Sequence, residues 1–160
     1  MLQQGCSESL LKQGIDPMPS YYDEKAKCRV GIMDEDQFYT ECESSNVAYF
    51  RDFIATWIKQ GGSLKWGAGG VSLRGAVDGK DISICFLAPQ YAGKKDRIEL
   101  ACASLSKQMG KDRLSSLEKS LRLAADEHVL GKTMISIVEP GTLPAPKQKA
   151  LKQAFVTLIQ

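Results

Sequence analysis

The segment 63–86 constrains the fold of this chain most, because its two turns predict the register of three strands. Asp78-Gly79 is favoured in two-residue hairpin turns, where both central residues need a positive φ. With this pair at the tip, the flanking strands align in facing pairs: Val77 with Lys80, Gly75 with Ile82, Leu73 with Ile84, and Val71 with Phe86. A second turn through 67–70 pairs Trp66 with Val71 and Leu64 with Leu73. Both turns gather apolar residues, Trp66 included, on one face, so this face is predicted to be core.

The rest of the chain alternates between helical and extended periodicity. The sequence predicts helices over about 46–60, 112–126 and 147–159. The first is expected to be capped by Ser44 or Ser45 and to bury Trp57 on its apolar face. It predicts strands over about 63–66, 71–77, 80–87 and 97–104, with a short one over 133–138. Strands that follow one another through tight turns pair antiparallel. We therefore expect an α+β fold, with an antiparallel sheet of three to four strands and the helices packed on one face.

Charge divides the chain unequally. Residues 1–45 carry nine acidic and four basic side chains, a net −5, whereas 46–160 carry ten acidic and seventeen basic, a net +7. We expect residues 1–45 to be an acidic, partly ordered extension and 46–160 to be a single domain. Within the extension, Asp34-Glu35-Asp36 predicts a helical turn through Phe38 and Tyr39, because carboxylates favour a helix N-terminus.

Composition excludes several protein classes. The 160 residues are 43% hydrophobic and 25% charged, as in ordinary globular domains. No apolar run reaches the length of a membrane span, and the N-terminus lacks the pattern of a signal peptide. A cytoplasmic protein with reduced thiols is therefore expected. The five cysteines include no C-x-x-C pair, so neither a metal site nor a cofactor is predicted.

The face of the sheet opposite Trp66 is the candidate binding surface. It is predicted to carry the cations Lys65, Arg74 and Arg97 among small side chains, including those of Ser83 and Cys85. Arginine offers a bidentate fork to phosphate, which favours an anionic partner. A solvated sheet face, or one that lets a helix pack closely, explains the same pattern.

A loop next to this face adds to the same candidate site. Tyr91 lies beside Lys94 and Lys95, a combination suited to base stacking and phosphate contact. A surface loop with solubilising lysines is the alternative interpretation of these residues.

No arrangement of residues predicts catalysis. The chain has no G-x-S-x-G, H-E-x-x-H or Walker motif, and its one histidine, His128, lacks a nearby nucleophile pattern. An enzyme is therefore the least favoured of three hypotheses. The sequence favours a non-catalytic binding or accessory domain that binds a partner protein. The alternative is a nucleic-acid-associated protein that binds phosphate through the basic sheet face.

Overall fold

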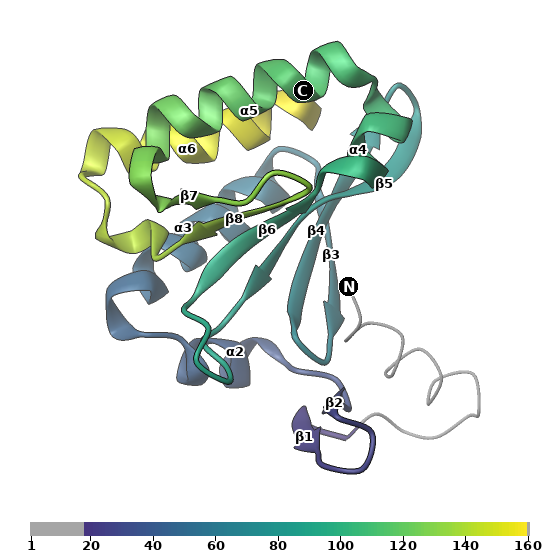
Figure 1. Ribbon diagram of the computed structural model, residues 1–160, viewed down its shortest axis with the longest axis vertical. Coiled ribbons are helices and arrows are strands. Elements are labelled where there is room, and N and C mark those ends of the chain that lie inside the picture. Colours follow the sequence, from purple (N-terminus) through teal and green to yellow (C-terminus); the bar gives the residue numbers. More distant parts are fainter. Residues whose placement is uncertain (1–17, 160) are drawn as a thin grey trace.

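A computed structural model describes residues 18–159 and has the α+β class predicted from the sequence. Within these residues, one sheet has six strands in the order β3-β4-β5-β6-β8-β7, and a second has the two strands β1 and β2 (Figure 1). The strands are β1 (Tyr21–Asp23), β2 (Cys28–Val30), β3 (Ser63–Gly67), β4 (Gly70–Val77), β5 (Lys80–Ala88), β6 (Arg97–Ala101), β7 (Val129–Leu130) and β8 (Met134–Val138). The α-helices are α2 (Glu35–Glu41), α3 (Ser44–Lys59), α4 (Cys102–Met109), α5 (Lys111–Ala125) and α6 (Ala145–Val156). Short 3-10 turns are η1 (Asp126–His128), η2 (Pro140–Thr142) and η3 (Thr157–Ile159).

The hairpin prediction is confirmed near its turn and wrong farther away. Asp78 and Gly79 have φ of 52° and 77°, Val77 faces Lys80, and Gly75 faces Ile82. The pairing of β3 with β4 also has the predicted register. Between Leu73 and Arg74, however, the register shifts at a β-bulge, so that Leu73 faces Cys85 instead of Ile84 and Val71 faces Leu87 instead of Phe86. Successive side chains of a strand point to opposite faces, so the extra residue on β5 places every later side chain of that strand on the face opposite to the predicted one.

The predicted sheet was too small, and one strand was too long. The sheet has six strands because β8 pairs with β6 and the two-residue β7 pairs with β8. The strand predicted over 97–104 ends at Ala101, and α4 begins at Cys102. Cys102, Leu105 and Met109 are the buried residues of α4, and their spacing is helical rather than alternating.

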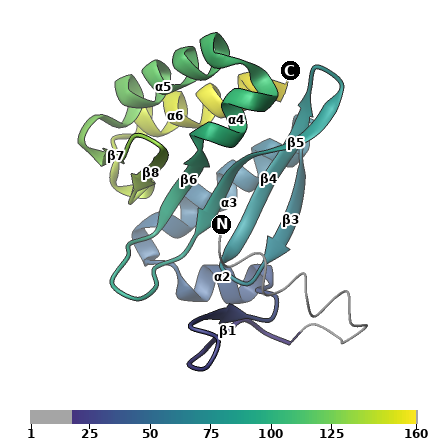
Figure 2. The ribbon, with the colours of Figure 1, turned by 45° about the vertical axis from the view of Figure 1, so that its right-hand side comes forward.

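The helices α3 and α6 cover one face of the sheet. Phe53 and Trp57 of α3 and Phe155 of α6 are fully buried, as are Leu73 and Ile98 on the sheet. Figure 2 shows α3 behind β4, β5 and β6. Trp57 is therefore core as predicted. Trp66 packs against this core but remains partly exposed on the edge strand β3.

Part of the acidic N-terminal segment also belongs to the core. Asp34 caps α2 by accepting a hydrogen bond from the Gln37 amide, which confirms the predicted helical turn. Met33 and Phe38 are fully buried, and the Met33 amide donates to the Gly67 carbonyl. The core thus extends to residue 33. Residues 1–17 of the predicted extension lie outside the described residues.

The described helices are all unsuited to crossing a bilayer, because none combines the necessary length with an apolar composition.

Candidate functional site

The outer face of the six-stranded sheet lies opposite α3 and α6. Paired positions in a sheet point to the same face, and one row of them crosses five strands: Lys65, Ser72, Phe86, Glu99 and Ser136. Phe86 reaches this face only because of the bulge in β5. The same bulge moves Cys85 to the core face, contrary to the sequence prediction, and leaves it 3% exposed.

The outer face is hollowed rather than flat. One hollow of about 230 Å³ lies between β5, β6, β8 and α4, and its lining includes Phe86, Ala101 and Leu105. A second, of about 470 Å³, extends from β6 and β8 to the tip of the 89–96 loop. Glu99 and Met134 line both hollows. We call the two together the outer-face groove, with a closed end at α4 and an open end at the 89–96 loop.

Three of the predicted site residues meet at the open end of the groove. Lys94, Lys95 and Arg97 line it together with the apolar side chains of Leu130 and Val138. The Lys95 ammonium lies 2.9 Å from the Glu139 carboxylate, and Arg97 is paired with Glu99. Lys94 is exposed and forms no ion pair with a described carboxylate. The open end therefore contains more positive than negative charge.

Arg74 lies apart from this group. Its Nε is 3.0 Å from Asp81 Oδ2, so part of its hydrogen-bonding capacity is used within the hairpin. Arg74 faces Ser83 on β5, whereas Arg97 faces Ala88. Those two β5 positions are five residues apart, or about 16 Å along the strand. The structure thus does not bring the two arginines together around a single phosphate group.

Lys65 and Tyr91 also lie at the margins. Lys65 is exposed on β3, which is separated from β6 by two intervening strands. The Tyr91 ring lies 5.7 Å from the ring of Tyr22, with the Arg29 guanidinium 5.0 Å from its centroid. Tyr91 therefore already stacks on the N-terminal hairpin, although it remains only partly buried.

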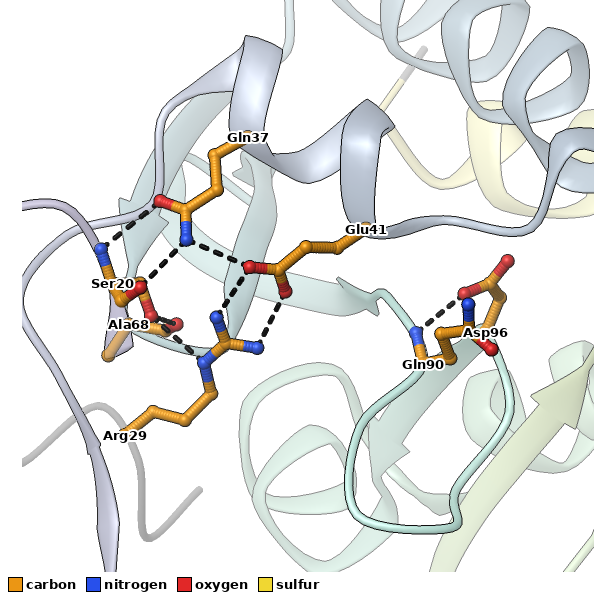
Figure 3. Close-up of polar contacts among 7 residues, drawn as sticks. All are labelled: Ser20, Arg29, Gln37, Glu41, Ala68, Gln90 and Asp96. Atoms are coloured by element: carbon orange, nitrogen blue, oxygen red, sulfur yellow. Dashed lines mark hydrogen bonds and ion pairs between the residues drawn. The ribbon is translucent and has the colours of Figure 1, made fainter. Parts of the chain in front are cut away.

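Asp96 holds the 89–96 loop in place. This fully buried carboxylate accepts hydrogen bonds from the amides of Gln90 and Glu43, both at 2.6 Å, and from Asn46 Nδ2 at 2.9 Å. Figure 3 shows the first of these contacts. Glu43 precedes α3 as its N-cap in place of the serine cap expected from the sequence. Asp96 thereby joins the start of α3 to the loop that carries Lys94 and Lys95.

A second polar cluster fixes the N-terminal hairpin to α2 (Figure 3). The buried Arg29 makes two hydrogen bonds to the Glu41 carboxylate, at 2.7 and 2.8 Å, and a third to Ser20. Gln37 also donates to Glu41. Burial by itself raises the pKa of Glu41, but the hydrogen bonds from Arg29 and Gln37 and the charge of Arg29 bring it below its ordinary value.

This ion pair predicts a dependence of stability on pH. A lowered carboxyl pKa in the folded state stabilises the fold above the ordinary value of 4.5, and this contribution is lost as the pH falls through the folded pKa. Glu41→Gln should lower the free energy of unfolding by about 1–3 kcal/mol at pH 7 and by much less at acidic pH. Urea denaturation from pH 7 to 3 measures this difference. Glu24→Gln, at an exposed pair with Lys27, is the matched control and should have little effect. An equal cost of Glu41→Gln at both ends of the pH range would contradict the assignment.

The described residues show no cluster suited to metal binding. No three or more histidine, cysteine or acidic side chains gather there as metal ligands. Burial raises the pKa of the Cys42 and Cys85 thiols, which disfavours the reactive thiolate. The His128 Nδ1 lies 2.8 Å from the Val138 carbonyl oxygen and is thus engaged with the backbone.

Several groove residues were not predicted from the sequence. The sequence predicted Phe86 on the core face and predicted no role in binding for Leu130 or Met134. Met134, Ser136 and Val138 are half-buried, and they alternate with the buried Ile135 and Ile137. That alternation is visible in the sequence and indicates an outer face, but not that this face is hollowed.

Comparisons with protein-family models, with curated proteins and with solved structures find no match for this chain.

Proposed function

We propose that this chain is a non-catalytic binding domain that holds an extended segment of a partner protein in the outer-face groove. The observation that carries the proposal is the groove itself, an apolar-lined depression on the sheet face that faces away from α3 and α6. Phe86, Leu130 and Met134 supply apolar contact area, and Leu130 is 52% exposed. Exposed apolar area with a polar rim is typical of surfaces that bind proteins.

Charge pairing favours a polypeptide over a nucleic acid. Proteins bind a phosphate backbone through cationic side chains, which displace the counterions of the nucleic acid. Arg74, Lys95 and Arg97 each contact a carboxylate of this chain, so binding phosphate through them would compete with existing ion pairs. A polypeptide can use the apolar lining without disrupting these pairs.

Nucleic-acid binding remains the second candidate because of one observation. Lys94 lies at the open end of the groove, and the partly exposed Tyr91 lies in the same turn, so that a cation and an aromatic ring are close together. This combination suits a single-stranded nucleic acid. Binding of that kind would weaken steeply with salt.

The test is a selection followed by a measurement at the groove. A library of random nine-residue peptides is selected on the full chain, and the enriched peptides are measured by fluorescence anisotropy. Ser136→Trp places a bulky ring in the groove and should weaken binding about tenfold or more. Ser120→Trp, on an exposed position of α5, is the matched control and should bind like the unmodified protein.

Two results would count against the proposal. If no peptide is enriched, or if Ser136→Trp and Ser120→Trp bind equally well, the groove does not bind peptides. A labelled oligothymidine that binds at about 50 mM salt and dissociates at about 200 mM would favour the nucleic-acid function instead.

A further inference from the structure

The two ends of the outer-face groove differ in chemistry. The closed end is lined by Ile84, Phe86, Ala101 and Leu105 and suits an apolar side chain. The open end has the exposed ammonium of Lys94 beside the Lys95–Glu139 and Arg97–Glu99 pairs. Between them lies Glu99, which lines both hollows and faces Ser136 on β8. An occupant of the whole groove therefore meets apolar groups, then a carboxylate and a hydroxyl, then cations.

Strand register gives the distance between these ends. Ala101 lines the closed end and Arg97 the open end, and the two are four residues apart on β6. Met134 and Val138 bracket the same interval on β8. Four residues of extended chain span about 13 Å, so a bound segment aligned with β6 covers the interval with four residues of its own. In an extended segment, positions i, i+2 and i+4 point to one side, so they would all face the groove.

We propose that the partner segment carries an apolar and an acidic side chain four residues apart. The apolar side chain occupies the closed end, and the carboxylate lies level with Arg97 at the open end, which Lys94 also lines. The position midway between them faces Glu99 and Ser136, so it is uncharged or basic rather than acidic. This inference rests on the proposed peptide-binding function and specifies which segments the groove accepts.

The test uses synthetic peptides in a titration that tolerates weak binding. The probe is a nine-residue serine–threonine peptide with a leucine at its third position and a glutamate at its seventh. It is titrated into the ¹⁵N-labelled full chain, and the dissociation constant is taken from amide chemical shifts. Moving the glutamate to the sixth position turns it away from the groove and should weaken binding about fivefold. Replacing the leucine by alanine should weaken it about tenfold.

Charge exchange tests the assignment of the open end. Lys94→Glu should weaken the glutamate peptide about fivefold and should favour a peptide with lysine at the seventh position. Lys80→Glu, at the exposed β4–β5 turn, is the matched control and should change neither affinity by more than about twofold. A second glutamate at the fifth position should weaken binding of the original peptide, because it would face Glu99.

The outcomes separate this inference from the function on which it rests. One outcome is that library peptides bind at the groove while the peptides with glutamate at the sixth and at the seventh position bind equally well. In that case the proposed spacing is wrong and the peptide-binding function stands. An unchanged preference for glutamate over lysine in Lys94→Glu likewise overturns the placement of the carboxylate. If neither these peptides nor any library peptide binds, the peptide-binding function itself fails.

Discussion

Replacing Asp96 by alanine is expected to lower the free energy of unfolding by about 3–5 kcal/mol. The substitution removes a fully buried carboxylate and leaves the buried side-chain amide of Asn46 and the partly buried backbone amides of Gln90 and Glu43 without their acceptor. Each buried donor that loses its partner costs about 1–3 kcal/mol. Since small domains are stable by only about 5–15 kcal/mol, this is a large fraction of the total.

Urea denaturation of two further variants makes the Asp96 prediction testable even if the alanine variant does not fold. Asp96→Asn keeps one acceptor oxygen and should cost about 2 kcal/mol. Asp81→Ala removes a carboxylate from an exposed pair with Arg74 and should cost less than about 1 kcal/mol. Similar unfolding free energies for Asp96→Asn, Asp81→Ala and the unmodified chain would show that Asp96 does not anchor the loop.

The Asp96 contacts also show what a sequence cannot reveal. The carboxylate and the Glu43 amide are separated by 53 positions, and no periodicity links them. The pattern at 34–36, by contrast, acts within one helical turn and correctly predicted the start of α2. The start of α2 and the turn at Asp78-Gly79 were therefore predictable from local chemistry, whereas the cap of α3 and the side chain that fixes the 89–96 loop were not.

The bulge in β5 limited the prediction of the binding face in a different way. From Ile84 to Ala88 every residue is apolar, so this run satisfies either phase of alternation and does not specify which side chains point inward. The predicted phase placed Phe86 in the core and Cys85 outside, and the observed phase is the reverse. The groove depends on this reversal, since Phe86 lines its closed end.

The five cations of the candidate site were predicted to share one surface, but the structure brings only three of them together. Lys94, Lys95 and Arg97 are close in sequence, and they also meet at the open end of the groove. Arg74 shares their face but lies two strands away, because alternation specifies a face and not a position along it. Their carboxylate partners, such as Glu139 for Lys95, come from a distant part of the chain.

Replacing Trp57 by alanine is expected to have the largest effect on stability of any substitution on α3. Its side chain is fully buried and packs edge-on against Phe53, with ring centroids 6.2 Å apart. Removal of a buried tryptophan costs about 3–5 kcal/mol. The indole Nε1 also donates to the Arg74 carbonyl at 2.8 Å, so the substitution deprives β4 of a hydrogen bond as well. The chain should be largely unfolded or strongly destabilised, as thermal and urea denaturation would show.

Two further variants test whether the hydrogen bond and the burial of Trp57 account for its expected cost. Trp57→Phe retains most of the ring but leaves the Arg74 carbonyl without its donor, so it should cost about 1–3 kcal/mol beyond the change in volume. Trp66→Ala removes the other tryptophan, which lies on the edge strand β3 and is only partly buried, with its ring against that of Phe38. It should cost about 1–3 kcal/mol, less than the full value expected for a core position. If Trp66→Ala proves as costly as Trp57→Ala, the buried fraction of a tryptophan side chain does not determine the free energy lost. The edge strand β3 is then held more tightly than its partial exposure indicates.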